Sequence, residues 1–345
     1  MPPFPGSVAK LFAPSAVFLR HGELYPMIAW RDGRPVGRIA AIVNRAHNRH
    51  YGDRTGFFGF FDFIDGEEVA RALYEAAMAK LVSRGCDSVR GPYNPTINDE
   101  VGVLVEGFER PPFVMMPFNP AYYAATYERL GLKTAHDLYC FLIRRNQKID
   151  DRITKIVGRV KRSTGLTLRT LDLGRLDQEL RVIEMLYNKT LCRNWGFVPI
   201  TYEELQFAAK DLKAIVDPEM VFIAEKNGAP VGFSMIIPNV NEYLWKARGS
   251  RSSLMRVLRF LWNLKFSRPK EVRVAVLGVL PEYSGSGIGS LFYYESLVRG
   301  RVKYEAAELS WVEDTNKDMM SGIALLGGEK YRTYRLYESA LPGGH

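Results

Sequence analysis

The chain carries an internal duplication, and this feature restricts its fold more than any other. Residues 27–44 (MIAWRDGRPVGRIAAIVN) align with residues 222–239 (FIAEKNGAPVGFSMIIPN) at an offset of 195 residues. Each copy has two strand-like runs around an Asp-Gly or Asn-Gly pair, which is typical of a β-hairpin. With 345 residues, the chain also exceeds the usual size of a single core. The sequence therefore predicts two related domains in tandem.

The order of the predicted elements is the same in both halves. A strand leads into a helix with an apolar stripe, over residues 69–81 in the first half and 288–298 in the second. A short strand, another helix and a closing strand follow in each half. Their ranges are 88–91, 120–130 and from 131 in the first half, and 307–311, 317–326 and from 328 in the second. This alternation predicts an α/β fold.

Basic residues crowd the joint between the halves. A cluster of Lys and Arg covers residues 144–169, within which 149–161 has helical periodicity, and the net charge of the chain is +9. We therefore divide the chain into a domain over 1–146, a basic connecting helix and linker over 147–170, and a second domain over 171–345. A second basic cluster covers residues 246–273. Solvated helix faces are the preferred interpretation of both clusters, and binding of phosphates, nucleic acid or another anionic partner is the alternative.

The most specific motif is a glycine-rich turn between a strand and a helix. An apolar strand over 272–280 ends at Pro281, glycines follow at positions 285, 287 and 289, and the helix begins at once. Glycines let backbone N–H groups converge on an anion, and a helix N-terminus adds positive partial charge. The turn therefore predicts a pyrophosphate site, with a tight turn that holds no ligand as the alternative.

With this turn the chain resembles the GNAT superfamily of acyl-CoA N-acyltransferases, whose Arg/Gln-x-x-Gly-x-Gly/Ala loop corresponds to residues 284–289. The resemblance implies two tandem GNAT-like domains with a degenerate N-terminal one, each a mixed, mostly antiparallel twisted sheet flanked by helices. It also implies acetyl-CoA or another acyl-CoA as co-substrate. The residues that it assigns to CoA are Leu277, Gly278 and Val279 for the pantetheine arm, Gly285, Ser286, Gly287, Ile288, Gly289 and Ser290 for the pyrophosphate, and Asn316 after the fifth strand.

The chain departs from the family pattern at charged and catalytic positions. Ser284 and Ser286 stand where relatives carry Arg or Gln and a further basic residue, so two charge-assisted phosphate contacts are missing. The basic cluster over 246–273 is a candidate replacement for this charge. Ile323 occupies the position of the usual tyrosine acid. The candidates for a general base are Asp314 and Glu308, and catalysis by positioning alone is the alternative.

The first half lacks the glycine series at its equivalent junction. Asp62, Asp65, Glu67 and Glu68 surround the start of the helix there, and their charges would repel a pyrophosphate, so we expect no CoA binding by this half. A polar stretch after residue 91 is a candidate acceptor pocket that faces the second domain, although a turn-rich insertion is the preferred interpretation. Its candidate residues are Tyr93, Asn94, Asn98 and Asp99, joined by Glu225 of the second half. In such an insertion the Asn and Asp side chains cap the local backbone.

These patterns favour an N-acyltransferase that acts on a small amine or amino-acid-like acceptor. Fem-type aminoacyl transferases, which use charged tRNA, are the second hypothesis, and a duplicated ligand-binding protein without catalysis is the third. Nucleic acid is otherwise not expected as a partner, because no zinc-finger or RNP-type motif accompanies the basic clusters. The Cys and His spacings predict no metal site. No window reaches about 18 apolar residues, so we expect a cytoplasmic protein without a membrane partner.

Overall fold

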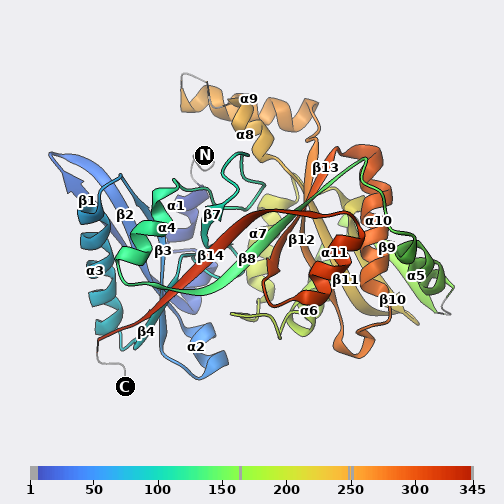
Figure 1. Cartoon of the computed structure of the whole chain (residues 1–345), viewed down its shortest axis with the longest axis horizontal. Helices are drawn as coiled ribbons and strands as arrows, with labels where there is room; N and C mark the ends of the chain where they lie inside the picture. The colour runs from blue at the N-terminus through green and yellow to red at the C-terminus, as the bar shows by residue number, and fades with distance from the viewer. Residues whose placement is uncertain (1–6, 163–164, 248, 250–251, 343–345) are drawn as a thin grey trace. The chain divides into compact units, whose positions relative to one another are not determined.

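The computed structural model describes residues 7–162, 165–247, 249 and 252–342 (Figure 1). The chain forms two compact units: unit 1 contains Met1–Leu138, Gly196–Val198 and Arg332–His345, and unit 2 contains Tyr139–Trp195 and Pro199–Tyr331. The boundaries of these units differ from the division at residues 147 and 171 that the sequence suggested, because unit 1 also contains segments from the second half of the chain. The difference arises because the C-terminal strand pairs with strands of the first half.

Unit 1 contains a sheet in the order β1-β2-β3-β4-β14, in which β3 and β4 are parallel and the other pairs are antiparallel. The strands of the first half are β1 (Gly22–Arg31), β2 (Arg34–Asn44), β3 (Thr55–Phe63), β4 (Ser88–Gly91), β5 (Tyr93–Asn94), β6 (Glu100–Val101), β7 (Val103–Glu106) and β8 (Lys133–Arg144). The helices of this half are α1 (Ser7–Phe12), α2 (Arg45–Tyr51), α3 (Glu67–Ser83) and α4 (Tyr122–Arg129). β8 and β14 (Glu329–Ala340) each contribute residues to both units.

Unit 2 contains a sheet in the order β8-β13-β12-β11-β10-β9, in which β12 and β13 are parallel and the hairpin strands are antiparallel. Its further strands are β9 (Leu166–Thr170), β10 (Val221–Lys226), β11 (Ala229–Pro238), β12 (Glu271–Val279) and β13 (Ala306–Glu313). Its helices are α5 (Asp151–Lys161), α6 (Leu176–Thr190), α7 (Tyr202–Leu212), α8 (Asn241–Ala247), α9 (Ser253–Phe266), α10 (Ile288–Lys303) and α11 (Lys317–Leu325). These mixed, mostly antiparallel sheets with flanking helices confirm the predicted α/β fold.

The duplicated segments form the hairpins β1–β2 and β10–β11, as predicted. Both turn residues have positive φ in each hairpin, at 50° and 73° for Asp32 and Gly33 and at 51° and 81° for Asn227 and Gly228. Such angles define a type I′ turn, which matches the twist of two antiparallel strands. A β-bulge follows Ala29 in the first hairpin and Ala224 in the second, again 195 residues apart. The likeness therefore extends from sequence to backbone irregularities.

The predicted apolar stripes fill the cores of the two units. In unit 1, Val69, Leu73, Ala77 and Leu81 of α3 are buried against a sheet to which β3 contributes aromatic side chains. In unit 2, Ile288, Leu291 and Phe292 of α10 are buried against β10 to β13. Burial of side chains of this size contributes about 1.5–3 kcal/mol each.

The predicted connecting helix, α5, is packed into unit 2. Ile153, Val157 and Val160 on one face are buried in the same core as α10. Asp150 caps the helix by accepting the N–H of Arg152 at 2.8 Å. α5 is therefore a structural part of unit 2. Across the described ranges, no helix of either unit is both long and apolar enough to cross a membrane.

Candidate functional site

The parallel strands β12 and β13 separate partway along their length. They pair from Glu271 to Val274 on β12, opposite residues 306–309 of β13, and no further pairing joins them in this fully described region, although both strands continue. A β-bulge shifts the register of β12 against β11 between Val274 and Val276. Bulges of this kind occur next to functional sites because they redirect the strand. Residues 277–279, predicted to pair with pantetheine, lie on β12 beyond the separation.

Helices cover both faces of the sheet near this separation. A Cβ at Gly278 would lie 2.1 Å from Thr190 Oγ1 of α6, and a Cβ at Gly232 would lie 3.2 Å from a ring carbon of Phe292 on α10. Gly232 pairs with Val279 and therefore faces the same side of the sheet as Val279. Gly278, the neighbour of Val279 in the strand, faces the opposite side, so α6 and α10 cover opposite faces. Any ligand on residues 277–279 must therefore approach along the strand edge.

The glycine turn directs several backbone N–H groups outward at the start of α10. Gly285 and Gly287 have φ of 73° and 86°, which only glycine adopts readily. In the described part of the chain, the N–H groups of Gly285, Gly287, Gly289 and Ser290 have no hydrogen-bond acceptor. Unpaired amides at a helix N-terminus form an anion-binding site together with the helix dipole. The turn therefore has the geometry of an anion site, and pyrophosphate binding there stays a prediction.

α5 lies directly against this turn. A Cβ at Gly287 would come within 2.7 Å of Val160 and 3.0 Å of Ile156, both on α5. Lys155 and Arg159, which flank this contact in the helix, are exposed. α5 therefore adds positive charge beside the turn. The turn itself lacks such charge, because Ser284 and Ser286 stand at the positions of the basic residues of relatives.

The second basic cluster lies elsewhere. Its helix α9 precedes β12, whereas the glycine turn follows β12, so the nine residues of the strand, about 30 Å, separate them. Arg273, a member of this cluster, is buried inside the sheet. Arg248 and Arg251 lie outside the described residues. The expectation that this cluster could replace the missing phosphate contacts is not supported, because α5 is the basic element beside the turn.

Asn316 and Ile323, the two positions after β13 that the family pattern singles out, have structural roles. Asn316 caps α11 by accepting the N–H of Met319 at 3.1 Å. Ile323, at the position of the usual tyrosine acid, is fully buried in the core of unit 2. Contact of Asn316 with CoA stays a prediction.

A buried polar network lies at the point where β12 and β13 separate. Arg273 and Glu308 are register partners, and Ser310 joins them by accepting from Arg273 Nε at 2.8 Å and donating to Glu308 at 2.7 Å. Tyr331 donates its hydroxyl proton to the other oxygen of Glu308. Glu308 is fully buried, and a buried charge requires such partners. The sequence had identified Glu308 as a candidate base but did not reveal its link to Tyr331, which lies on a different strand.

Beyond this network, Glu313 is the last residue of β13 and Asp314 follows it. Burial raises the pKa of the Glu313 carboxyl, the nearby Asp314 raises it further, and the N–H of Trp195 opposes the shift by donating at 3.1 Å. Glu313 therefore combines partial burial with a raised pKa, the properties of a general base at neutral pH. The sequence had identified Asp314 as a candidate base, and no local pattern distinguishes it from Glu313.

In unit 1, residues of the chain itself occupy the space beyond the paired part of β3 and β4, which corresponds to the space between β12 and β13 in unit 2. β3 and β4 pair over three positions, and a Cβ at Gly59, just beyond them, would lie 1.5 Å from the carbonyl oxygen of Tyr93. The Asn94 side chain accepts the N–H of Phe60 at 2.6 Å. The start of α3 carries Glu67, which pairs with arginines of the same unit. These contacts give a physical reason for the expectation that this half does not bind CoA.

The other acceptor candidates make local contacts in their own units. Asp99 accepts from the N–H and the hydroxyl of Thr96, at 3.2 and 2.7 Å, and Asn98 donates to Val198 at 3.3 Å. In unit 2, Glu225 binds Arg169 at 2.6 Å. Tyr93 is buried, and burial raises its pKa. These contacts match the turn-rich interpretation, and a role in acceptor binding stays a prediction.

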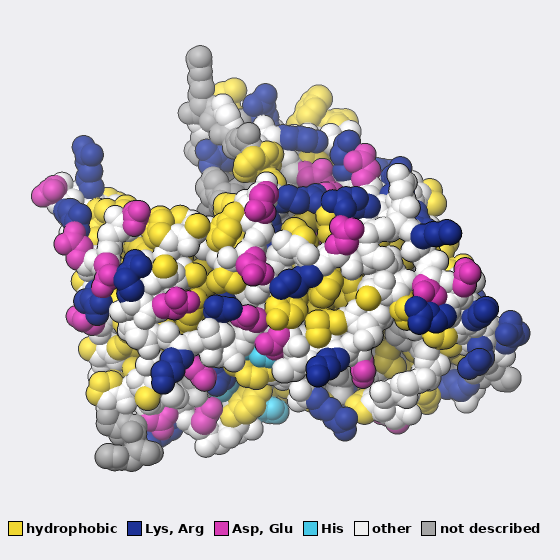
Figure 2. Space-filling view, viewed as in Figure 1, with side chains coloured by type: hydrophobic (Ala, Val, Ile, Leu, Met, Phe, Trp, Pro, Cys, Tyr) yellow, Lys and Arg dark blue, Asp and Glu magenta, His cyan; other side chains and the backbone are white. Residues whose placement is uncertain are grey.

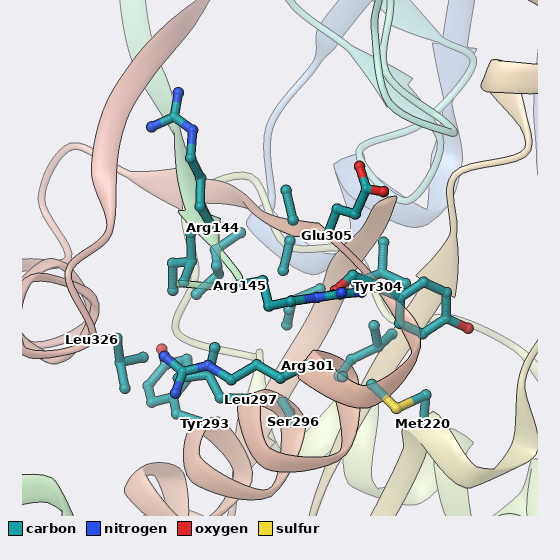
Figure 3. A pocket seen from close by; sticks show the side chains of 18 residues that line it. Arg144, Arg145, Met220, Tyr293, Ser296, Leu297, Arg301, Tyr304, Glu305 and Leu326 are labelled. Carbon is teal, nitrogen blue, oxygen red and sulfur yellow. The ribbon is translucent and has the colours of Figure 1, made fainter. Parts of the chain in front are cut away.

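A cavity of about 40 Å³ lies beneath the second half of α10 (Figure 3). Apolar side chains of α10, β12 and β13 line it, and Figure 3 shows Arg145 extended along it toward Tyr304, whose carbonyl accepts Arg145 Nε at 2.9 Å. This volume holds one or two water molecules, so the cavity is too small for a substrate. Among the described residues, no group of His, Cys, Asp and Glu side chains is arranged to hold a metal ion.

Sequence comparison finds two curated relatives that match most of the chain, and no family model matches it. Protein YghO of Escherichia coli (strain K12) is 36% identical over 320 residues, which cover 91% of this chain and 81% of that protein. A bacterial ceramide synthase of Caulobacter vibrioides is 34% identical over 332 residues, which cover 94% of this chain and 85% of that protein.

Solved structures share the fold at low sequence identity. A tandem GNAT protein from the clavulanic acid biosynthesis pathway has a TM-score of 0.54 and 13% identity, over 94% of this chain and 85% of that one. A GCN5-related N-acetyltransferase from Sphaerobacter thermophilus has a TM-score of 0.50 and 13% identity, over 91% and 79%. These likenesses show the tandem GNAT fold that the glycine turn and the duplication predicted.

Proposed function

Because the chain belongs to the family of protein YghO and the bacterial ceramide synthase, within the GNAT superfamily, we propose that it is an acyl-CoA-dependent N-acyltransferase. The observation that carries this proposal is the glycine turn, which presents unpaired N–H groups at the start of α10. The CoA pyrophosphate would bind there, with Lys155 and Arg159 of α5 nearby to offset its charge.

The separated edge of β12 would hold the rest of the donor. Amide groups of the pantetheine arm would pair with Leu277, Gly278 and Val279 as an added strand does, because β13 has moved away from this part of β12. The thioester would then lie near the space between the strands, close to the Glu308 network and the end of β13.

Glu313 is the group that we propose as general base. The acceptor amine attacks the thioester carbonyl, the C–N bond forms, and the C–S bond breaks to release the CoA thiolate, which is reprotonated. The proton lost by the amine passes to Glu313, directly or through a water molecule. Glu308 is already held by two hydroxyl donors, so its proposed role is to position Tyr331 and β13.

The proposed acceptor is a long-chain amino alcohol. A ceramide is an amide between a fatty acid and such an amino alcohol, and a relative that is 34% identical is a ceramide synthase. An amine of this kind satisfies the expected acceptor chemistry, and a fatty acyl-CoA would be the matching donor.

The test combines calorimetry with a product assay on the purified full chain. Titration with a fatty acyl-CoA should show binding, and incubation with a long-chain amino alcohol should yield the amide and free CoA, detected by mass spectrometry. A Gly289→Asp variant should lose CoA binding, because its carboxylate stands in the proposed phosphate site where an added Cβ meets no other atom. Gly66→Asp, at the start of α3 and equally unobstructed, should bind CoA normally.

Absence of acyl-CoA binding at millimolar concentration would contradict the proposed donor. Binding without transfer to any amine would instead support the non-catalytic hypothesis. Amide formation from aminoacyl-tRNA but not from acyl-CoA would support the Fem-type hypothesis.

A further inference from the structure

α9 has a large apolar face that is exposed to solvent. The residues of this face recur at spacings of three, four and seven, which places them on one side of a helix. They are each 49–67% exposed, and they are Leu254, Met255, Leu258, Leu261, Trp262 and Phe266. Exposed apolar groups scattered singly are ordinary, but a contiguous patch marks an interaction surface.

The opposite side of α9 is already packed. Phe260 forms an edge contact with Tyr243 of α8, with ring centres 6.3 Å apart, and Val257 and Leu264 are partly buried. In Figure 1, α9 lies next to α8 and outside the strands and helices that form the body of unit 2. The exposed stripe is therefore a second apolar face, which packing on α8 does not use.

Positive charge accompanies this face. α9 carries Arg256, Arg259 and Lys265 and no acidic residue. Lys265 lies within the stripe, with its ammonium 5.4 Å from the centre of the Phe266 ring. Lys246 and Arg268 flank the helix and are exposed. In Figure 2, hydrophobic and basic side chains lie side by side over this region.

We infer that α9 is an interfacial helix that docks the protein on an anionic lipid bilayer. An apolar face joined to basic side chains suits a membrane surface, where the face enters the headgroup boundary and the long basic side chains reach the phosphates. At 14 residues α9 is about 21 Å long, shorter than the roughly 30 Å of a bilayer core, so it would lie in the surface. Trp262 suits that depth, since its ring is apolar and its N–H is polar.

This inference revises the expectation of no membrane partner, which considered only spanning segments. It does not depend on the proposed function, because the exposed face and its charge are independent of the glycine turn. It would nevertheless place unit 2 at the surface where a long-chain amine resides.

Co-sedimentation of the full chain with vesicles tests the inference. The protein should bind vesicles that contain phosphatidylglycerol more tightly than vesicles of phosphatidylcholine alone. A Leu258→Glu/Trp262→Glu variant should lose at least about tenfold in affinity, from the loss of apolar contact. Arg259→Gln/Lys265→Gln should lose about thirtyfold on the anionic vesicles only. Val302→Glu, at an exposed apolar side chain of α10, should bind as the unmodified chain does.

Unchanged vesicle binding by the Leu258→Glu/Trp262→Glu variant, with its circular dichroism intact, would overturn the inference. So would a shift of that variant from dimer to monomer in vesicle-free sedimentation without any loss of vesicle binding, because the face would then join two copies of the chain. Acyl transfer to a detergent-solubilised amine should persist in the variant, so failure of docking and failure of the proposed function are distinguishable.

Discussion

At the scale of a single residue, the partial burial of Glu313 favours its proposed role as a base but lowers the stability of the fold when the carboxyl is charged. Burial and Asp314 raise its pKa, so the folded chain retains this proton to a higher pH than the unfolded chain does. The free energy of unfolding therefore falls as pH rises through the window from the ordinary Glu pKa to the raised one. Above this window the folded chain bears the cost of a partly buried charge.

Glu313→Gln should separate the stability of this site from its activity. We expect kcat to fall by about 10²–10⁴-fold, because the general base is lost. The acid limb of the kcat/KM pH profile should disappear, and stability at neutral pH should be retained or rise, measured by urea unfolding. Glu329→Gln, at an exposed carboxylate, should change neither quantity. An unaltered pH profile in Glu313→Gln would assign the base elsewhere.

At the scale of elements, the glycine turn places different demands on its glycines. Gly287 has positive φ and faces α5 closely, so Gly287→Ala should cost about 1–2 kcal/mol or more of stability. Gly289 lies inside the helix with open space at its Cβ, so Gly289→Ala should stabilise by up to about 1 kcal/mol. Thermal unfolding of both variants checks this contrast. Equal effects would mean that α5 does not restrict the turn.

The contact of α5 with the turn leads to a prediction about charge. Lys155→Gln/Arg159→Gln should weaken CoA binding by about tenfold and make it less sensitive to salt, because exposed charges act over about 10 Å. Arg268→Gln, at the opposite end of β12, should leave CoA affinity unchanged. Calorimetry at low and high salt measures both. A larger loss in Arg268→Gln would return the phosphate role to the 246–273 cluster.

At the scale of the whole molecule, most of the C-terminal strand β14, from Arg332 onward, belongs to the first unit. Residues 337–340 pair with β4, and Tyr337 is fully buried in the core of unit 1. Arg332 reaches the carbonyl oxygens of Gly107 and Arg110 at 3.0 and 2.6 Å. Neither half of the sequence therefore contains all the strands of one sheet.

Tyr337→Ala should destabilise unit 1 by about 3–5 kcal/mol, as expected for a large buried aromatic side chain. Hydrogen exchange should accelerate in β4, which lies far from residue 337 in sequence. Glu338→Ala, which removes only a surface ion pair with Arg90, should cost under about 1 kcal/mol. A fragment of residues 1–146 should lack cooperative unfolding, and a cooperative transition in it would show that β14 is dispensable.

The sequence by itself determined the features that depend on neighbouring residues. The repeated hairpins follow from Asp-Gly and Asn-Gly turns, α3 and α10 follow from their apolar periodicity, and the turn at the start of α10 follows from alternating glycines. Each of these is set by backbone sterics or by a pattern within about 20 residues. The resemblance to the GNAT superfamily rested on such a pattern, and the tandem GNAT fold that it implied was confirmed.

Only the tertiary structure decided which distant residues meet. It brought Tyr331 to Glu308, packed α5 against Gly287, paired the end of β14 with β4 of unit 1 and left the outer face of α9 uncovered. Each outcome depends on which strands pair or on which apolar faces pack against another element. The spacing of neighbouring residues determines neither of these. Periodicity shows that α9 is apolar on several sides, but only its packing on α8 shows which of those sides remains exposed.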